Sequence, residues 1–276
     1  MIVEPAPAKI NLALHVRRRR ADGYHDLETL FAFLRDGDTI SVDRADTASF
    51  ALTGPFAAVL AGEGDNLVTR AAARFAEVFG TSGAYAISLD KHLPVASGIG
   101  GGSADAAATL RALARLEGID PLDPRMFVIA EALGADVPAC LLGRSAIGEG
   151  KGERLEPVDG VTDMPVLLVN PGVGVSTGAV FTAWDGVDRG PIPPGTLIER
   201  ALGGRNDLEP PARALAPVID AVLAMLAEHK GVTLARMSGS GATCFALFAD
   251  TKARDAAAAA INRAQPSWWT LASTLG

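Results

Sequence analysis

The chain has 276 residues, of which 49% are hydrophobic and 5% aromatic, and its formal net charge is −7 at pH 7. This length fits one large domain or two modest ones, and the hydrophobic fraction is ample for a buried core. The acidic balance argues against nucleic acid as a partner, because proteins that bind it are normally basic.

The cysteines and the lack of long apolar runs indicate in which cellular compartment the protein is expected. Cys140 and Cys244 lie far apart in apolar surroundings, which is typical of buried thiols in a reducing compartment and not of a disulfide framework. No apolar run has the length of a membrane span, and the N-terminus lacks the pattern of a secretory signal. We therefore expect a cytoplasmic protein without a membrane partner.

The first half of the chain alternates predicted strands with predicted helices. Apolar residues recur at helical spacing in some segments and alternate in others. On that basis we expect strands over residues 8–16, 38–43 and 85–89, and helices over residues 66–79, 103–117 and 125–133. The helix over residues 103–117 follows a glycine-rich loop and is closed by Gly118.

The second half begins after a segment rich in Gly, Glu, Pro and Asp at residues 148–163, where we place a domain boundary. The predicted domains are residues 1–155 and 156–276. We expect strands over residues 165–170 and 232–236, a strand or helix edge over 244–248, helices over 214–228 and 252–263, and a loop with one short helix over 185–206. Strands and helices intermingle without a strict βαβ period, which favours an α+β fold with two layers.

The most informative motif is PVASGIGGGSADAAA at residues 94–108. Its four glycines, Gly98 and Gly100 to Gly102, lead directly into the predicted helix. A glycine loop at a helix start presents backbone N–H groups and the positive end of the helix dipole, which together bind phosphate. Ser103 is expected to be the N-cap or to donate its hydroxyl to the same anion.

Other glycine-loop interpretations fit less well. A P-loop requires a lysine after the glycines, and none follows here. A dinucleotide fingerprint would need glycine where Ser103 stands, and its acidic residue would be Asp120, which lies in a predicted turn. A flexible linker would not usually open directly into an amphipathic helix.

Four polar segments outside this loop each allow two interpretations. Asp136 lies between the predicted helix over residues 125–133 and a possible helix start over residues 137–142, either as an N-cap or as a general base. Lys9 stands in an apolar strand, either exposed or buried and paired. Tyr24 and His25 form either a packed hairpin turn or a stacking face and hydrogen-bonding edge for a nucleobase. The basic run at residues 17–20 reads as a solvated hairpin end more readily than as a ligand site, and its role stays open.

The loop motif resembles the second motif of the GHMP kinases, P-x-x-x-G-[LI]-G-x-x-S-[SA]-x-A-A. The matching residues are Pro94, Gly98, Ile99, Gly100, Ser103, Ala104, Ala106 and Ala107. The triple glycine followed by S-A-D resembles the branch that acts on 4-diphosphocytidyl-2-C-methyl-D-erythritol. Further family elements follow in order, so that the resemblance covers nearly the whole chain: PAKIN at 7–11, RADGYH at 20–25, GADVP at 134–138 and MSGSGA at 237–242.

The resemblance implies a fold and an activity. The fold would be a two-domain α+β GHMP kinase fold, with an N-terminal domain like the second domain of ribosomal protein S5 and a ferredoxin-like C-terminal domain. The activity would be transfer of the γ-phosphoryl group of ATP to the 2-hydroxyl of a small molecule with a cytidine diphosphate moiety, with Mg²⁺ bridging the phosphates. The chain would act as a monomer or weak homodimer, and its metal ligands are not identified.

The resemblance also assigns residues. Asp136 would be the general base, paired with Lys9. The ATP side would be formed by Pro94, Gly98, Gly100, Gly101, Gly102, Ser103, Lys91 and Asn66. The acceptor side would be formed by Asn11, Tyr24, His25, Phe31, Thr177, Phe181, Ser240 and Gly241. In this assignment His25 reads the cytosine edge while Tyr24 and Phe181 stack on the base, although core packing competes as an explanation of Phe181.

Two rival functions stay open at this point. Another GHMP kinase, for mevalonate, homoserine or a sugar, is disfavoured by the combination of Tyr24, His25 and Phe181. A nucleotide-binding regulatory protein without turnover is disfavoured by the presence of both Lys9 and Asp136. Asn206 and Asp207 also match the family branch, and we expect them to be structural.

Overall fold

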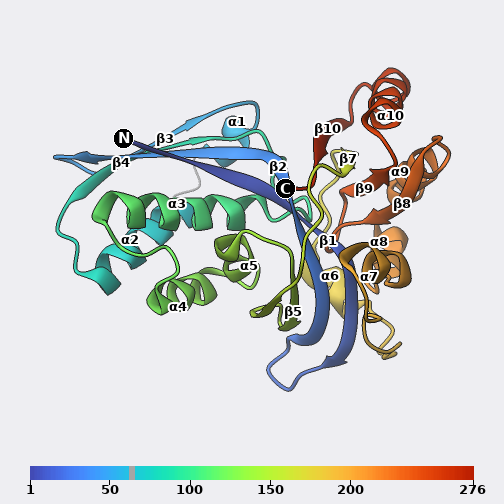
Figure 1. The fold of residues 1–276 in the computed structure, drawn as a ribbon, viewed down its shortest axis with the longest axis horizontal. Coiled ribbons are helices and arrows are strands. Elements are labelled where there is room, and N and C mark those ends of the chain that lie inside the picture. Colours follow the sequence, from blue (N-terminus) through green and yellow to red (C-terminus); the bar gives the residue numbers. More distant parts are fainter. Residues whose placement is uncertain (62–65) are drawn as a thin grey trace. The chain divides into compact units, whose positions relative to one another are not determined.

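The computed structural model describes residues 1–61 and 66–276, and contacts group them into two compact units (Figure 1). Unit 1 comprises Met1–Lys9, Asp36–Val95 and Gly100–Gly143, and unit 2 comprises Ile10–Arg35, Ala96–Ile99 and Arg144–Gly276. Strands β1 (Ile2–Arg19) and β2 (His25–Ala45) contribute residues to both. The boundary expected between residues 155 and 156 stays a prediction, because these units group several chain segments rather than cutting the chain once.

Unit 1 pairs strands with a set of helices. The second half of β2 pairs antiparallel with β4 (Ala84–Asp90), which pairs in parallel with β3 (Ser49–Thr53). The helices are α1 (Ala57–Leu60), α2 (Leu67–Phe79), α3 (Gly101–Glu117), α4 (Pro124–Leu133) and α5 (Val137–Leu142). Helix α3 packs against α2, α4 and α5, as its many buried alanines allow.

Local sequence explains where the two long helices of unit 1 begin and end. The Asn66 side chain accepts a hydrogen bond from the backbone of Val68 at the start of α2, and Gly80 ends that helix in the left-handed conformation. Helix α3 ends at Gly118, as predicted, but it begins at Gly101 with Gly100 as N-cap. The prediction that Ser103 could be the N-cap was therefore wrong, because Ser103 lies inside the first helical turn.

Unit 2 contains an antiparallel four-stranded sheet with the order β10-β7-β9-β8. Its strands are β7 (Pro165–Asn170), β8 (Val232–Met237), β9 (Cys244–Phe248) and β10 (Trp269–Thr274). Counted along the chain, the fourth strand lies beside the first, then the third and the second, which is the ferredoxin-like arrangement. This unit also contains β5 (Ala146–Gly150), which pairs with the first half of β2, and β6 (Arg154–Pro157), which pairs with β5.

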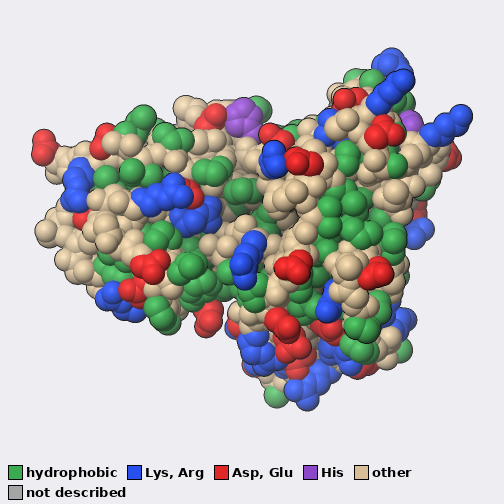
Figure 2. All heavy atoms as spheres, in the orientation of Figure 1, with side chains coloured by type: hydrophobic (Ala, Val, Ile, Leu, Met, Phe, Trp, Pro, Cys, Tyr) green, Lys and Arg blue, Asp and Glu red, His purple; other side chains and the backbone are tan. Residues whose placement is uncertain are grey.

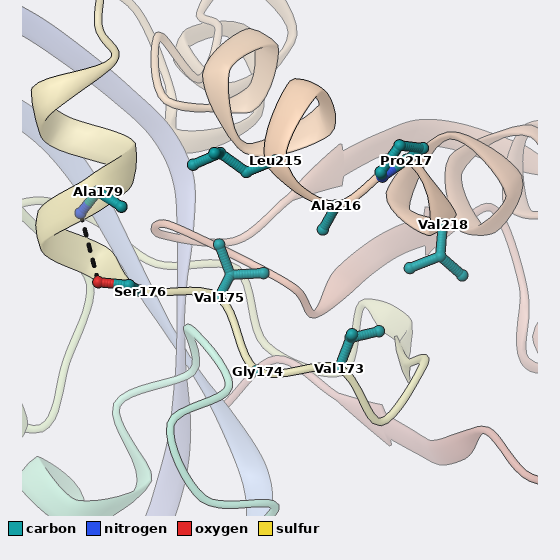
Figure 3. Close-up of a pocket in the computed structure, with 9 residues that line it drawn as sticks. All are labelled: Val173, Gly174, Val175, Ser176, Ala179, Leu215, Ala216, Pro217 and Val218. Atoms are coloured by element: carbon teal, nitrogen blue, oxygen red, sulfur yellow. Dashed lines mark hydrogen bonds between the residues drawn. The ribbon is translucent and has the colours of Figure 1, made fainter.

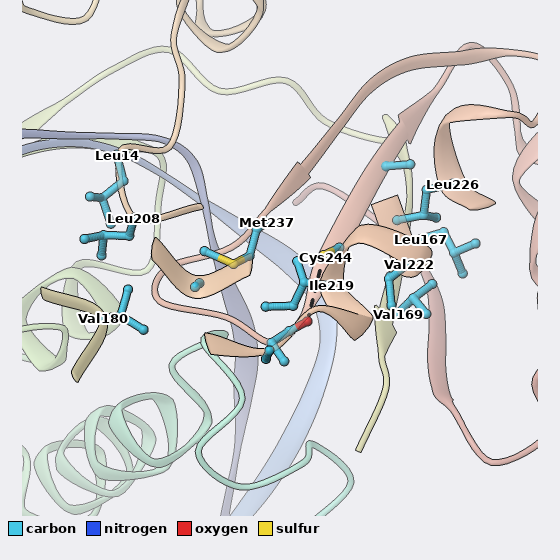
Figure 4. Close-up of a cluster of buried hydrophobic side chains, with 14 of the residues drawn as sticks. Leu14, Leu167, Val169, Val180, Leu208, Ile219, Val222, Leu226, Met237 and Cys244 are labelled. Atoms are coloured by element: carbon cyan, nitrogen blue, oxygen red, sulfur yellow. Dashed lines mark hydrogen bonds between the residues drawn. The ribbon is translucent and has the colours of Figure 1, made fainter. Parts of the chain in front are cut away.

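The helices of unit 2 cover an apolar core. They are α6 (Thr177–Thr182), α7 (Leu197–Gly203), α8 (Glu209–Leu215), α9 (Val218–Ala227) and α10 (Thr251–Ala264). Figure 4 shows Leu167 and Val169 of β7 near Val222 and Leu226 of α9. Cys244 lies in the same core, and burial raises the pKa of its thiol. Both cysteines are buried and unpaired, as expected.

Several elements differ from the prediction. Strands β1 and β2 are longer than expected, and β3, α1, β5 and β6 were not predicted. The helix expected over residues 214–228 is two helices, because Pro217 has no N–H to continue α8 and instead caps α9. Helix α6 was not predicted, since six residues are too few for a clear periodic signal. Strand β10 was also missed, although it pairs with β7 along its whole length.

The basic run at residues 17–20 lies at the end of the hairpin between β1 and β2. Arg17 bonds to Glu28 and Asp188, Arg18 to Asp26, and Arg20 to Asp22 and Asp26, whereas Arg19 donates to the carbonyls of Thr182 and Trp184. Figure 2 shows basic and acidic side chains gathered there. The hairpin-end interpretation is confirmed. In the described parts of the chain, no helix is long and apolar enough to cross a membrane.

Arg236 holds unit 2 together in a way that the sequence did not reveal. Its buried guanidinium donates to the carbonyls of Leu12, Ala201 and Gly204. We expect Arg236→Met to lower the free energy of unfolding by about 3 kcal/mol in urea denaturation, because unsatisfied buried carbonyls cost about 1–3 kcal/mol each. Arg213→Met, which removes an exposed ion pair to Asp220, should cost less than about 1 kcal/mol. Equal losses in the two variants would contradict this role.

Candidate active site

A buried lysine meets an aspartate in unit 1. Lys9 on β1 is 2% exposed, and its Nζ lies 2.8 Å from Oδ2 of Asp136, whose side chain is 37% exposed. Asp136 stands at the N-cap position of α5, but its side chain makes no capping hydrogen bond. The carboxylate is therefore held by the ammonium of Lys9 while part of it stays accessible. The alternatives of a snorkelling lysine and a capping aspartate are wrong.

The start of α3 offers an uncapped helix N-terminus. Gly100 adopts the left-handed conformation with φ of 66°, and among the described side chains none caps the helix. The N–H of Ala104 donates to the carbonyl of Gly100. The N–H groups of residues 101–103, which precede Ala104, therefore lie at the positive end of a 17-residue helix. Gly102 is exposed there and Ser103 is half-buried. Such an arrangement can bind an anion.

Gly98 and Gly101 lie where neighbouring atoms leave little room for a side chain. In unit 2, a Cβ on Gly98 would lie 2.6 Å from the carbonyl oxygen of Ser238 and 2.7 Å from that of Gly241, so only glycine fits where the two glycine loops meet. The Ser238 hydroxyl donates to the Gly98 carbonyl. In unit 1, Gly101 is buried and has no left-handed φ, and a Cβ there would lie 3.1 Å from Nζ of Lys91.

Two residues assigned to the ATP side, Lys91 and Asn66, have structural partners, and a third is buried. Lys91 is 2% exposed, with its Nζ 2.5 Å from Asp38 and 2.6 Å from Asp105. The side-chain oxygen of Asn66 accepts a hydrogen bond from the backbone of Val68 and so caps α2, and Pro94 is buried. These contacts argue against a direct contact of Lys91 with adenine, because its ammonium is already bound by two carboxylates.

Unit 2 brings together the aromatic residues assigned to the acceptor. The ring centroids of His25 and Phe181 are 4.9 Å apart, and Trp184 meets His25 edge-on at 5.7 Å. Nε2 of His25 is buried without a hydrogen-bond partner among the described residues. Burial, with a smaller effect of Arg19, lowers the pKa of His25 and favours the neutral imidazole. Tyr24 is exposed, with Nζ of Lys151 5.0 Å from its ring centroid.

The remaining acceptor residues divide into two groups. The hydroxyls of Thr177 and Ser240 bond to each other at 2.9 Å, which joins α6 to the loop containing Gly241. Asn11 is buried and donates to Thr29. Phe31 is 1% exposed in β2, and this core position argues against a direct substrate contact.

Sequence reasoning missed several residues around these groups. Asp38 and Trp184 contact predicted site residues but belong to no motif, and only the rarity of tryptophan could have drawn attention to Trp184. Asp105 stands in the S-A-D part of the loop motif and Arg19 in the basic run, but neither was assigned to the site. Asn206 was expected to be structural, and this is confirmed. Its Nδ2 donates to the carbonyls of Met237 and Gly239 and so fixes the second glycine loop.

One cavity of about 460 Å³ in unit 2 lies outside the predicted site residues (Figure 3). It is lined by residues 173–176 and Ala179 on one side and by residues 215–218 on the other. The lining is almost entirely apolar, which suits no charged nucleotide. No group of three or more His, Cys, Asp or Glu side chains in residues 1–61 and 66–276 could hold a metal ion.

Comparisons with known proteins bear on these assignments. The family models of the GHMP kinases N terminal domain and the GHMP kinases C terminal match residues 66–144 and 195–267. A Rhizorhabdus wittichii protein named 4-diphosphocytidyl-2-C-methyl-D-erythritol kinase is 56% identical, over 99% of this chain and 94% of its own. A Novosphingobium aromaticivorans protein of the same name is 50% identical, over 99% and 92%.

A solved structure agrees with these matches. The crystal structure of a 4-(cytidine 5'-diphospho)-2C-methyl-D-erythritol kinase superposes with a TM-score of 0.84 and 38% identity, and the match covers 100% of this chain and 99% of that one. The predicted two-domain fold is thereby confirmed. The chain belongs to the GHMP kinases, a family of ATP-dependent kinases that act on small molecules.

Proposed function

We propose that this chain phosphorylates the 2-hydroxyl of 4-diphosphocytidyl-2-C-methyl-D-erythritol with ATP, a step in the non-mevalonate synthesis of isoprenoid precursors. The names of its near-full-length relatives support the acceptor. The observation that carries the chemistry is the ion pair of Lys9 and Asp136, which holds a carboxylate accessible but oriented.

Asp136 is the general base of this proposal. Its carboxylate takes the proton of the acceptor hydroxyl as that oxygen bonds to the γ-phosphorus and ADP leaves. The ammonium of Lys9 fixes the carboxylate through the 2.8 Å contact and supplies positive charge beside the proton transfer. Because Lys9 is buried, its position is set by packing, so little reorganisation is needed during the reaction.

The first turn of α3 binds the ATP phosphates in this proposal, through the backbone of residues 101–103 and the hydroxyl of Ser103. The uncapped N-terminus supports it, because the helix dipole and the backbone donors both favour an anion. Mg²⁺ typically binds through substrate phosphates with few protein ligands, and it would neutralise the charge that develops on them.

The cytosine is read by His25 and stacked by Tyr24 and Phe181. The buried, unpartnered Nε2 of His25 supports this, since such a nitrogen gains a hydrogen bond when a base edge arrives. Thr177 and Ser240 supply hydroxyls in the same unit. We also propose a cytoplasmic location, supported by two buried unpaired cysteines, and a monomer or weak homodimer.

Asp136→Asn tests the base. We expect kcat to fall by about 10²–10⁴-fold with unchanged affinity for an ATP analogue, because a positioned base contributes about that much. Asp123→Asn is the matched control, since Asp123 caps α4 and should affect stability but not kcat. Coupled ADP-release kinetics measure both, and a variant at position 136 that keeps wild-type kcat would remove Asp136 from the mechanism.

Gly102→Val tests the phosphate site. Gly102 is exposed, and a Cβ there would meet only Leu67 at 3.4 Å, so the valine should block the anion without disturbing the core. We expect titration calorimetry to show at least about tenfold weaker binding of an ATP analogue, or about 1.4 kcal/mol. Gly83→Val, at another open glycine of unit 1, should bind normally. Unchanged affinity in Gly102→Val would exclude this turn as the phosphate site.

Tyr24→Ala and Phe181→Leu test the cytosine pocket. Each should raise KM for the acceptor by about 10- to 100-fold and leave KM for ATP nearly unchanged, because stacking on a base contributes about 1–3 kcal/mol. Leucine preserves the packing of Phe181 against the core, and Trp268→Leu removes another aromatic ring from the same core as a control. If Phe181→Leu and Trp268→Leu change Tm and both KM values alike, Phe181 is only a core residue.

A further inference from the structure

A buried cluster of one cation and two carboxylates lies directly at the start of α3. Lys91 follows strand β4, Asp38 lies on β2 and Asp105 lies on α3 itself, and all three are 2% exposed. The Lys91 ammonium donates to Oδ2 of both aspartates. Oδ1 of Asp38 accepts the backbone N–H groups of His92 and Leu93 and so fixes the chain that leads to the glycine loop.

The cluster lies beside the helix start at Gly101. A Cβ on Gly101 would lie 3.1 Å from Nζ of Lys91 and 3.8 Å from Oδ2 of Asp38. The ammonium therefore occupies the space beside the first residue of the helix. Loss of Lys91 would open this space beside the turn that carries the following N–H groups.

The charge of the cluster depends on one proton. With both aspartates ionised, the cluster would carry a net negative charge, buried next to a turn that has to attract phosphate. Asp105 has a buried Oδ1 without a hydrogen-bond partner among the described residues, which is costly for an ionised carboxylate. Burial, opposed by Lys91 and assisted by Asp38, raises the pKa of Asp105 to about 8. Lys91 stays charged, because the two aspartates raise its pKa more than burial lowers it.

We propose that Lys91 and Asp105 are positioning residues for nucleotide binding: Lys91 sets the first turn of α3 through Gly101, and protonated Asp105 keeps the cluster neutral beneath the phosphates. Neither residue contacts the nucleotide. This inference rests on the proposed role of the α3 N-terminus in binding ATP.

Other groups that face Asp105 do not titrate in the relevant range. From α5 the titratable group is Cys140, and burial raises the pKa of its thiol to about 12. The buried faces of α2 and α4, which pack against α3, are apolar: Val68, Ala71, Phe75, Met126, Ile129, Ala130 and Leu133. A change in nucleotide affinity near pH 8 that Asp105→Asn abolishes would therefore be assigned to the cluster.

The test measures the affinity of the full chain for a non-hydrolysable ATP analogue with Mg²⁺ by calorimetry, from about pH 7 to about pH 9.5. Wild-type affinity should fall by about tenfold as Asp105 ionises, since one unit of pKa difference between free and bound protein corresponds to that factor. Asp105→Asn, which resembles the protonated acid, should bind like wild type at pH 7 and lose this fall. Titration of the analogue itself affects both proteins equally and cancels in the comparison.

Glu4→Gln is the matched control. Glu4 is a buried carboxylate that also anchors α3, but it does so through Arg111 and Arg115, far along the helix from Gly101. This variant should lower Tm and keep the wild-type pH profile.

Lys91→Met should weaken analogue binding by at least about tenfold at pH 7.

The outcomes separate this inference from the proposed function. If the wild-type chain binds no analogue, the nucleotide site itself is wrong and the inference falls with it. If the wild-type chain binds, the inference is overturned by an Asp105→Asn variant that keeps the wild-type pH profile, or by a folded Lys91→Met variant with wild-type affinity. Should Lys91→Met fail to fold, the profile of Asp105→Asn decides alone.

Discussion

The physical constraint on which unit 1 depends is the close packing of two buried lysines against two consecutive glycines. A Cβ on Gly100 would lie 2.9 Å from Cε of Lys9, and a Cβ on Gly101 would lie 3.1 Å from Nζ of Lys91. Each ammonium is paired with carboxylate, so the charges can be buried at tolerable cost. The helix start is thus supported by buried, paired side chains, and this packing would pre-organise its N–H groups for the anion of the proposed function.

The four glycines of the motif at residues 94–108 are therefore needed for different physical reasons. Gly98 allows two loops of unit 2 to meet, and Gly100 supplies the left-handed turn that starts α3. Gly101 makes room for Lys91, whereas Gly102 is exposed and leaves the turn open to a ligand. A motif match alone treats these positions as equivalent, but substitutions in them should fail for different reasons.

Local patterns carried most of the fold prediction, and long-range contacts account for what it missed. The period of apolar residues and the glycine stops gave α2, α3 and β4 almost to the residue, because those signals lie within each segment. Lys91 was assigned to the ATP side through the family resemblance, and nothing near it in sequence reveals Asp38, which lies 53 residues away. Similarly, β10 is stabilised by its pairing with the edge of β7, and no pattern within residues 269–274 predicts that pairing.

The residues of the proposed cytosine site already contact one another and a nearby cation. The rings of His25 and Phe181 are too close, at 4.9 Å between centroids, to admit a base between them, so a base must stack on an outer face. Tyr24 presents such a face, but the ammonium of Lys151 lies 5.0 Å from its centroid. A cation–π contact at an exposed site is worth about 0.5–1 kcal/mol, whereas stacking of a base is worth about 1–3 kcal/mol. In the proposed acceptor complex, the cytosine would therefore displace Lys151 from the ring of Tyr24.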